Sequence, residues 1–375
     1  MVKNHLELRI KSYFKFSSQL AGLDNTQLCS LFDNNEPGTS NSSSGQNHTI
    51  VLGQSKIFVK RIPITDIEYE NLFSTKNLYD LPTCFNYGVG SIGFGVFREL
   101  MTHIKTTNWV LEGATATFPL MYHHRIIPFF GQRENIDMEN HKSFVEYWSN
   151  NASIENYVLD RANANYELVL FLEYIPYVLE TWLQENPSKL QQPLDELCTT
   201  ITFLRRKGII HFDAHFRNVL TDGKQIYLTD FGLVLDKSFS LTKDEESFFK
   251  QNQFYDYGEV LRNLGHLIRS RYDLCSENDK RTIMEKYEIK EGFKPYELGS
   301  ILLDSIEQIH ADDVMKLDEF YVNSIVKYRS IIALMQDFFV EMYNNNNKDT
   351  KFPHTKLRQM LKETGFISGS GNYDR

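Results

Sequence analysis

The fold is indicated first by His211-Phe212-Asp213-Ala214-His215-Phe216-Arg217-Asn218 and by Asp230-Phe231-Gly232 further along the chain. Asn218 follows Asp213 by five residues, and Asp230 follows it by seventeen. Phosphoryl transfer needs metal-bound oxygens and a proton acceptor on rigid turns, because the transferred group is anionic throughout. Two carboxylates and an amide in this order can gather around Mg²⁺ and a triphosphate. The order and spacing therefore predict a phosphate-handling site.

Short apolar pieces flank these polar residues. Val219-Leu220 and the alternating run 225–229 are typical of strands, and Asp222-Gly223 between them is typical of a hairpin turn. The pattern predicts a β-hairpin with Asn218 just before its first strand and Asp230 just after its second. The alternative is that the two motifs arose independently and that Asp213 is only a turn residue. In that case the agreement of both motifs with the local strand and turn pattern would not be expected.

Composition and charge limit the class of protein. At 375 residues the chain is long enough for about two domains whose cores need no disulfides. The formal net charge of −9 argues against general binding to a nucleic-acid backbone. The scattered cysteines form no metal-binding cluster, and they are Cys29, Cys84, Cys198 and Cys275. We therefore expect a reducing compartment and no nucleic-acid partner.

Neither a secretory signal nor a membrane span is recognisable. Residues 1–10 mix charged with apolar side chains, unlike the apolar core of a signal peptide. The richest apolar run, Leu168 to Leu172, is stopped by Glu173. Together with the scattered cysteines, these features predict a soluble cytoplasmic protein with no membrane partner.

The first half of the chain reads as helices followed by strands. Apolar residues recur mostly every three to four positions through the first thirty or so residues, which predicts a helical extension over 1–37. A polar segment rich in small residues, 33–45, precedes a strand candidate at 49–52. The β-branched and aromatic content of 56–64 predicts another strand. The chain beyond Gly232 is expected to be mostly helical.

The order of these features resembles the protein-kinase-like superfamily. A lysine on a strand, a glutamate on a helix, a strand leading into a linker, and then the two motifs occur in this order over roughly residues 38–270. The histidine at 215, two residues after Asp213, is more similar to the aminoglycoside and choline kinase branch and to divergent bacterial kinases than to typical eukaryotic protein kinases. The stretches 58–66 and 87–100 are also similar to bacterial proteins described only as protein-kinase-like.

The resemblance implies an α+β, bilobal protein-kinase-like fold. A small β-rich N-lobe would span residues 38–173, and a larger α-rich C-lobe would span 174–375. The helical extension 1–37 would precede both lobes.

The resemblance also assigns roles to individual residues. Asp213 would orient or deprotonate the acceptor hydroxyl, and Asn218 and Asp230 would hold Mg²⁺. Lys60 would pair with the α- and β-phosphates of ATP, while Glu99 would hold the lysine in place. ATP and Mg²⁺ are therefore the expected cofactors.

Three further residues acquire roles in the same way. Glu173 and Ile175, where a predicted strand leads into the linker, are expected to bind the nucleotide. Asp256 opens a predicted helix at the position where kinases brace the catalytic loop through its backbone amides. An ordinary helix N-cap is the alternative for Asp256.

The lysine and the glutamate have competitors. Lys56 lies on the same strand candidate as Lys60, and the even spacing places both on one face, although the apolar run around Lys60 favours that residue. Glu68 or Glu70, on a short helix, are the alternatives to Glu99. The predicted helix around Glu99 has the clearer apolar stripe, which favours it.

A glycine-rich pattern occurs in an unexpected place. Gly88-Val89-Gly90-Ser91-Ile92-Gly93 matches a phosphate-binding pattern, but it follows Lys60 and would require Lys105, in a predicted helix, as the replacement lysine. We therefore expect this run to be a turn that leads into a closely packed helix. The predicted phosphate-covering residues are instead Gly38, Ser42, Ser43 and Gly45.

Several histidines are candidates for supporting roles. His211 is expected to support the catalytic turn by a hydrogen bond. His215 is expected either to help position a phosphate or metal, or to make a structural contact. His123 and His124 are not expected to bind metal, because neighbouring strand residues point to opposite faces.

The acceptor is the least specified part of the prediction. Between Gly232 and Asp256 the Ala-Pro-Glu motif that closes the peptide-docking segment of protein kinases does not occur. A protein serine or threonine is the first acceptor hypothesis, and a small-molecule hydroxyl is the second. A non-catalytic nucleotide-binding module and an adenylyltransferase are further alternatives. Hydroxyls in this segment that autophosphorylation could modify are Ser238, Ser240, Thr242 and Ser247.

Overall fold

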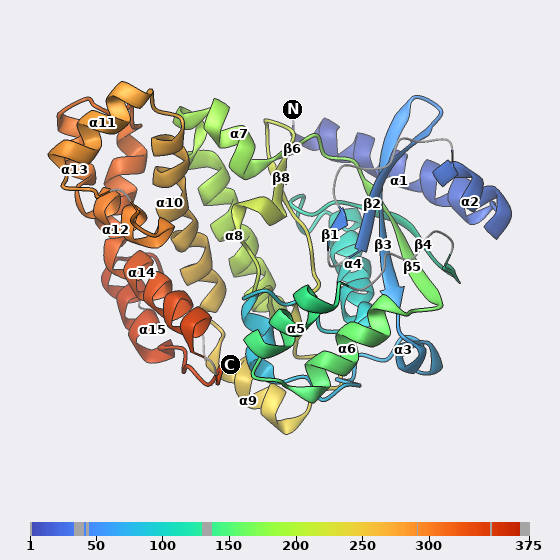
Figure 1. Ribbon diagram of the computed structural model, residues 1–375. Coiled ribbons are helices and arrows are strands. Elements are labelled where there is room, and N and C mark those ends of the chain that lie inside the picture. Colours follow the sequence, from blue (N-terminus) through green and yellow to red (C-terminus); the bar gives the residue numbers. More distant parts are fainter. Residues whose placement is uncertain are drawn as a thin grey trace.

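The chain folds into a mixture of helices and antiparallel strands (Figure 1). The computed structural model describes residues 2–33, 41–42, 45–129, 137–290, 292–345 and 347–367. The strands are β1 (Asn41–Ser42), β2 (Gly45–Leu52), β3 (Ser55–Ile64), β4 (Met121–Pro128), β5 (Tyr166–Glu173), β6 (Tyr177–Val178), β7 (Ile209–Ile210), β8 (Val219–Thr221), β9 (Ile226–Leu228) and β10 (Leu235–Asp236). The α-helices are α1 (Val2–Ala21), α2 (Asn25–Asp33), α3 (Asp66–Glu70), α4 (Val96–Leu111), α5 (Met138–Tyr147), α6 (Ala152–Ala162), α7 (Leu179–Glu185), α8 (Gln191–Lys207), α9 (Lys243–Gln251), α10 (Tyr255–Asp273), α11 (Glu277–Lys286), α12 (Pro295–Asp304), α13 (Ile306–Ala311), α14 (Glu319–Asn344) and α15 (His354–Glu363). The 3₁₀ helices are η1 (Thr83–Tyr87), η2 (Pro187–Lys189) and η3 (Phe216–Asn218).

The largest sheet contains five strands in the order β1-β2-β3-β5-β4, with every neighbouring pair antiparallel. The central strand β3 pairs with β5 from Ile57 opposite Glu173 to Ile64 opposite Tyr166. Residues 167–172 of β5 are all buried, so both faces of the sheet are covered.

Helices provide this cover. On one face, Phe97 and Leu100 of α4 belong to the same buried cluster as Leu170 of β5. On the other face, the ring of Phe32 in α2 stacks on that of Phe171, with the centroids 6.3 Å apart. Within the helical extension predicted over 1–37, the structure has α1 and α2, whose apolar residues help to build the core of the sheet region, while residues 34–37 lie outside the described residues.

A region made almost entirely of helices occupies the other side of the molecule (Figure 1). Helices α10 and α14 approach closely at two glycines of α10. A Cβ atom at Gly258 would lie 2.6 Å from Met335 Sδ, and one at Gly265 would lie 2.8 Å from Ile332 Cγ2, so a larger residue would separate the helices. In the described part of the chain, no helix is long and apolar enough to cross a membrane.

Short strands lie between the two regions. The predicted β-hairpin is confirmed, since β8 pairs with β9 antiparallel and Gly223 in its turn has a φ of 81°. β6 adds to the other edge of β8. β7, which precedes the His211 motif, pairs instead with β10, which follows the Asp230 motif. The β7–β10 pair therefore brings the start of the His211 motif close to the chain after the Asp230 motif. The β8–β9 pair brings the end of the His211 motif close to the start of the Asp230 motif.

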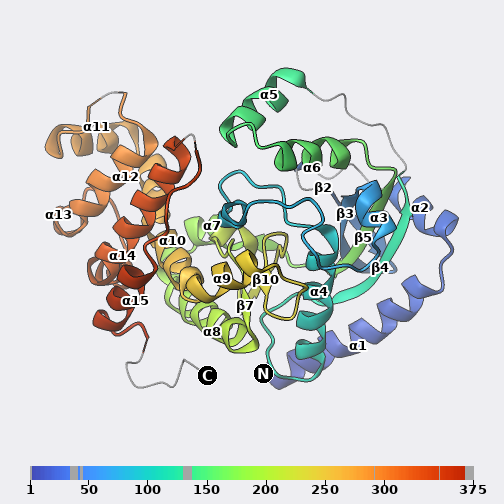
Figure 2. The same cartoon turned by 90° about the horizontal axis from the view of Figure 1, so that it is seen from below.

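Two long connections leave the sheet region and reach the helical region (Figure 2). One is the segment 71–95 between α3 and α4. The other joins β4 to β5 and contains α5 and α6. At the end of α5, the ammonium group of Lys348 lies 3.6 Å from the centroid of the Tyr147 ring. This contact fastens α5 to the chain that follows α14.

Candidate active site

The turn that carries Asp213 is held by a carboxylate from α10. Phe212 adopts a left-handed backbone conformation with a φ of 65°, which an apolar side chain rarely does. The carboxylate of Asp256 accepts hydrogen bonds from the backbone amides of His211 at 2.7 Å and Phe212 at 2.9 Å. The N-cap of α10 is Phe254, so the N-cap alternative for Asp256 is wrong. The side chain of Asp256 instead fixes the strained turn.

The imidazole of His211 connects this turn to the one that carries Asp230. Its Nδ1 accepts a hydrogen bond from the Asp213 amide at 3.2 Å, and its Nε2 lies 3.1 Å from the carbonyl oxygen of Thr229. Burial lowers the pKa of His211 to about 4, so the ring is neutral near pH 7 and donates through Nε2. The structure thus places His211 in the supporting position expected from the sequence.

Asn218 lies between the same two turns. Its side-chain amide donates to the Asp213 carboxylate at 2.8 Å and to the Asp213 carbonyl at 3.0 Å. Its backbone carbonyl accepts from the Thr229 amide at 3.0 Å. With both contacts made by the Asn218 NH₂ group, the Oδ1 atom is left as a ligand atom for a cation.

A buried lysine joins the Asp230 turn to α4. The ammonium group of Lys60, on β3, lies 2.7 Å from Glu99 Oε1 and 3.0 Å from Asp230 Oδ1. Burial alone would lower the pKa of Lys60, but the two carboxylates outweigh it and raise this pKa. Burial alone would raise the pKa of Asp230, and Lys60 outweighs it to lower this pKa to about 2. Both carboxylates are therefore ionised beside the lysine.

The competing residues lie elsewhere. Lys56 is exposed, and its ammonium group lies 5.2 Å from the centroid of the Tyr174 ring. Glu70 is also exposed, whereas Glu68 is buried and accepts a hydrogen bond from the Val96 amide at 2.9 Å. Glu68 therefore caps the N-terminus of α4. Of the candidates, the structure brings together only Lys60 and Glu99.

The carboxylate of Asp213 lies between His215 and Asn218. Burial, together with the charges of Asp230 and Glu259, raises the pKa of Asp213 to about 7. One of its oxygens lies 3.3 Å from His215 Nε2, while the other accepts from Asn218. A carboxylate with a pKa near neutrality is suited to accept a proton from a hydroxyl group.

The donor set fits Mg²⁺. Asp230 keeps its second carboxylate oxygen beyond the one that contacts Lys60, and Asn218 keeps Oδ1. Mg²⁺ in nucleotide sites is commonly held by one or two protein oxygens together with phosphates and water. Within the described residues, His, Cys, Asp and Glu side chains form no metal-binding group of three or more. A cation here would therefore depend on the phosphates of a bound nucleotide for most of its ligands.

The glycine-rich run 88–93 lies against the turns that carry Asp213 and Asp230, although the sequence indicated only a turn. A Cβ atom at Gly88 would lie 3.0 Å from Asp213 Oδ1, and the Phe94 amide donates to the Gly232 carbonyl at 2.8 Å. Lys105 lies on α4 and contacts Asp236, so it does not replace Lys60. The run therefore forms a wall of the site.

The predicted phosphate-covering residues are only partly described. Gly38 and Ser43 lie outside the described residues. Ser42 ends β1 and is paired with Gly45 at the start of β2, so these two residues belong to an antiparallel pair that precedes the lysine strand. The phosphate-covering role of all four residues stays a prediction.

Sequence reasoning missed Arg9 of α1. Its guanidinium is buried and forms a two-pronged ion pair with Glu173 at the end of β5, with two contacts of 2.8 Å. It also donates to the carbonyl oxygens of Ala116 and Phe118 at 2.7 and 2.6 Å. The partner Glu173 is 164 residues away along the chain, so no local pattern could have indicated the pair.

His123 and His124 of β4 are paired with two successive residues of β5, Phe171 and Leu170. A β-bulge interrupts β4 just before His123, and the two rings lie with their centroids 6.1 Å apart. Burial lowers the pKa of both rings, and that of His123 falls to about 4. Phe171 and Leu170 belong to the buried clusters on the two different faces of the sheet, which agrees with the expected opposite faces.

No family model matches the chain, and no curated protein matches it significantly. The arrangement of Lys60, Glu99, Asp213, Asn218 and Asp230 is therefore interpreted from its own geometry.

Proposed function

We propose that the protein is an ATP- and Mg²⁺-dependent phosphotransferase with a bilobal protein-kinase-like fold. The observation that carries the proposal is the pairing of Lys60 with both Glu99 and Asp230, next to the hydrogen-bonded pair of Asp213 and Asn218. Lys60 comes from β3 and Glu99 from α4, and both lie far along the chain from the two turns that carry Asp213 and Asp230. Such an arrangement has the cation, the metal ligands and the proton acceptor that phosphoryl transfer from ATP requires.

Each side chain has a distinct task in the proposed reaction. Lys60 binds the α- and β-phosphates, and Glu99 keeps its ammonium group in position. Asn218 and Asp230 would hold Mg²⁺, which when bound would neutralise charge on the phosphate oxygens. Asp213 orients the acceptor hydroxyl and accepts its proton as the γ-phosphoryl group passes to the hydroxyl oxygen, while the bond from the γ-phosphorus to the β-phosphate oxygen breaks and ADP leaves.

The linker after β5 supplies the proposed contacts to the nucleotide base. The side chain of Glu173 is engaged by Arg9, and its amide donates to the Leu120 carbonyl at 2.8 Å. The backbone carbonyl of Glu173 and the backbone of Ile175 are then the groups that bind the base. Arg9 thus holds Glu173, and with it the start of the linker, in a fixed position.

Replacing Arg9 with Met is expected to raise the KM for ATP about tenfold with little change in kcat. Removing the guanidinium leaves Glu173 without its charged partner, so the linker loses its fixed position, and a lost charge-assisted hydrogen bond has about this effect. Steady-state kinetics with varied ATP checks the result. The control is Lys11→Met, which removes an exposed charge from the same helix. An unchanged KM in Arg9→Met would show that Arg9 has no part in nucleotide binding.

The first acceptor class is a serine or threonine side chain of a protein. The segment after Gly232 lacks the peptide-docking motif of protein kinases and contains α9. In addition, the Gly88 backbone lies directly beside Asp213. These two observations favour a compact acceptor, so a small-molecule hydroxyl is the second candidate. The four cysteines are free of disulfides, which supports a reducing cytoplasmic location.

Labelled ATP distinguishes the proposed reactions. The purified protein is incubated with Mg²⁺ and with γ-labelled or α-labelled ATP, alone and with cell extract. We expect label from the γ position in protein, and a loss of at least about 100-fold in Lys60→Met. The matched control is Lys56→Met, which changes an exposed lysine of the same strand and is expected to retain activity.

The other outcomes identify the alternatives. Label from the γ position only in low-mass material would support a small-molecule kinase. Transfer of α label would indicate an adenylyltransferase, and nucleotide binding without transfer would indicate a non-catalytic module. Equal transfer by the Lys60→Met and wild-type proteins would contradict the proposed site.

A further inference from the structure

Residues 71–95, the segment that joins α3 to α4, contact three parts of the candidate active site. They lie between the helix that carries Glu99, the turn that carries Asp230 and the turn that carries Asp213. In kinases, the lysine–glutamate ion pair and the metal-binding aspartate must both be in place for catalysis, and phosphorylation of a loop commonly controls this. The contacts of residues 71–95 show how α4, which carries Glu99, and the turn that carries Asp230 are held in this protein.

Both ends of the segment are anchored at α4. Glu68, in the helix before the segment, caps α4 through the Val96 amide, and Gly95 at this N-cap has a φ of 119°. Near the start of the segment, the Thr75 carbonyl accepts a hydrogen bond from Arg98 of α4 at 2.9 Å. The same threonine accepts through its hydroxyl from the Ser240 amide at 3.0 Å. The segment therefore ties α4 to the chain that follows the Asp230 turn.

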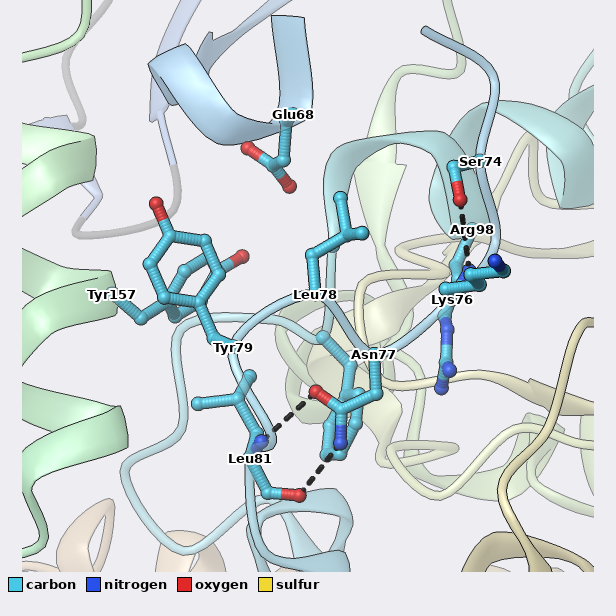
Figure 3. A pocket seen from close by; sticks show the side chains of 11 residues that line it. Glu68, Ser74, Lys76, Asn77, Leu78, Tyr79, Leu81, Arg98 and Tyr157 are labelled. Carbon is cyan, nitrogen blue, oxygen red and sulfur yellow. Dashed lines mark hydrogen bonds between the residues drawn. The ribbon is translucent and has the colours of Figure 1, made fainter. Parts of the chain in front are cut away.

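The first part of the segment is closely packed. Figure 3 shows Asn77 bonded to both backbone groups of Leu81, with Tyr79 beside Tyr157 of α6. The cavity between these residues measures only about 10 Å³, which is room for about one water molecule. This part of the segment is a packed support rather than a ligand site.

The second part of the segment holds the Asp230 turn. The side-chain amide of Asn86, which is completely buried, donates to the Leu233 carbonyl at 2.9 Å. The Phe94 amide donates to the Gly232 carbonyl at 2.8 Å. The two backbone carbonyls that directly follow Asp230-Phe231 are therefore both bound by the segment.

Tyr87 connects the segment to the catalytic loop and the helical region. Its hydroxyl donates to Asn252 Oδ1 at 3.2 Å, and its ring lies edge-on to Phe212 with the centroids 6.0 Å apart. Other rings within 6 Å of Tyr87 belong to Phe248, Tyr255, Phe338 and Phe352. The segment is thus embedded in the aromatic core beneath the turn that carries Asp213.

Two of the four hydroxyls that phosphorylation could modify, those of Thr242 and Ser238, have structural partners. Thr242 caps α9, its hydroxyl accepting from the Glu245 amide at 3.2 Å. Lys105 of α4 donates to the hydroxyl of Ser238. The segment after the Asp230 turn is therefore ordered by neutral hydroxyls and by residues 71–95.

We propose that residues 71–95 hold α4 and the Asp230 turn in the assembled arrangement without phosphorylation of residues 233–254, and that Asn86 is the positioning residue for this turn. That this arrangement is the one needed for catalysis rests on the proposed function. That Asn86 holds the Asp230 turn in the unmodified chain does not depend on phosphoryl transfer.

Amide hydrogen exchange measured by mass spectrometry tests the proposal. Asn86→Leu removes the donor to Leu233 while keeping the volume of the side chain. We expect exchange over 230–234 to rise about tenfold, the usual effect of one lost hydrogen bond, while exchange in α14 stays unchanged. The matched control is Asn71→Leu, because the Asn71 amide also donates to a carbonyl, but to Ile67 on the exposed surface. Exchange over 230–234 equal in Asn86→Leu and wild type would overturn the role of Asn86.

The wild-type protein provides a second test that needs no variant. After phosphatase treatment, with the absence of phosphate verified by intact mass, we expect residues 230–234 and α4 to remain protected and γ-phosphoryl transfer to keep its rate. Fast exchange that slows only after phosphorylation would overturn the proposal. If exchange in α14 also rises in Asn86→Leu, the variant has unfolded. The experiment on the wild-type protein then decides whether the arrangement needs phosphorylation. Protection without any transfer by the wild type would contradict the proposed function and leave the positioning role standing.

Discussion

Asp213→Asn is expected to lower kcat for phosphoryl transfer by about 10²- to 10⁴-fold, the usual contribution of a positioned proton acceptor. The amide of Asn has nearly the shape of the carboxylate and preserves an oxygen for the contact from Asn218, which donates to Asp213 at 2.8 Å. It does not accept a proton from a hydroxyl group. Nucleotide binding is expected to change little, because the proposed contacts to the phosphates come from Lys60 and from bound Mg²⁺.

The effect is measured as initial rates of γ-label transfer with saturating ATP, and as nucleotide affinity by calorimetry. Asp244→Asn is the control, since it removes an exposed carboxylate in the first turn of α9. A kcat for Asp213→Asn within about threefold of the wild type would remove Asp213 from the reaction. A parallel loss of nucleotide affinity would show a general disturbance of the site.

The second large effect concerns stability. Arg98 of α4 and Glu245 of α9 form an ion pair of 2.7 Å in which each side chain is only 1% exposed. Arg98→Met leaves the carboxylate buried without a charged partner, and breaking such a pair typically costs about 3–5 kcal/mol. We therefore expect the free energy of unfolding of Arg98→Met to fall by about this amount, as measured by denaturant titration.

The double variant separates the lost charge from lost packing. Glu245→Gln keeps an oxygen that can accept from the Thr242 amide, the capping contact made by Glu245 at 2.9 Å. Adding it to Arg98→Met removes the unpaired charge, so we expect more than half of the lost stability to return. Lys142→Met, in the exposed pair with Glu146, is the surface control and is expected to have no measurable effect. Equal stability of Arg98→Met and the double variant would show that the unpaired charge is not the cause.

The local elements around the site were predictable because their signals are short-range. The strand of Lys60, the helix of Glu99 and the β8–β9 hairpin each follow from apolar period and turn chemistry within about ten residues. The helix that begins at Asp66 was anticipated as well. Its Glu68 was a plausible partner for the lysine, and only the fold shows that this carboxylate caps α4 instead.

The supports of the site were not predictable in the same way. Arg98 and Glu245 are separated by 147 residues, and Asn86 and Leu233 also by 147. Such pairs depend on how distant elements pack, which no local period encodes. The glycine-rich run at 88–93 gave a signal, but its pattern suggested a phosphate loop or a turn. Its contact with Asp213 follows from the path of residues 71–95 across the core.

The central claim is that Asn218 and Asp230 hold a metal-bound triphosphate beside Lys60 and Asp213. A crystal structure of the protein with Mg²⁺ and a non-hydrolysable ATP analogue tests it most directly. We expect Mg²⁺ at about 2.1 Å from Asn218 Oδ1 and from the Asp230 carboxylate, with Lys60 on the phosphates. A nucleotide bound away from Lys60, Asn218 and Asp230, in crystals soaked to saturation, would contradict the proposed function.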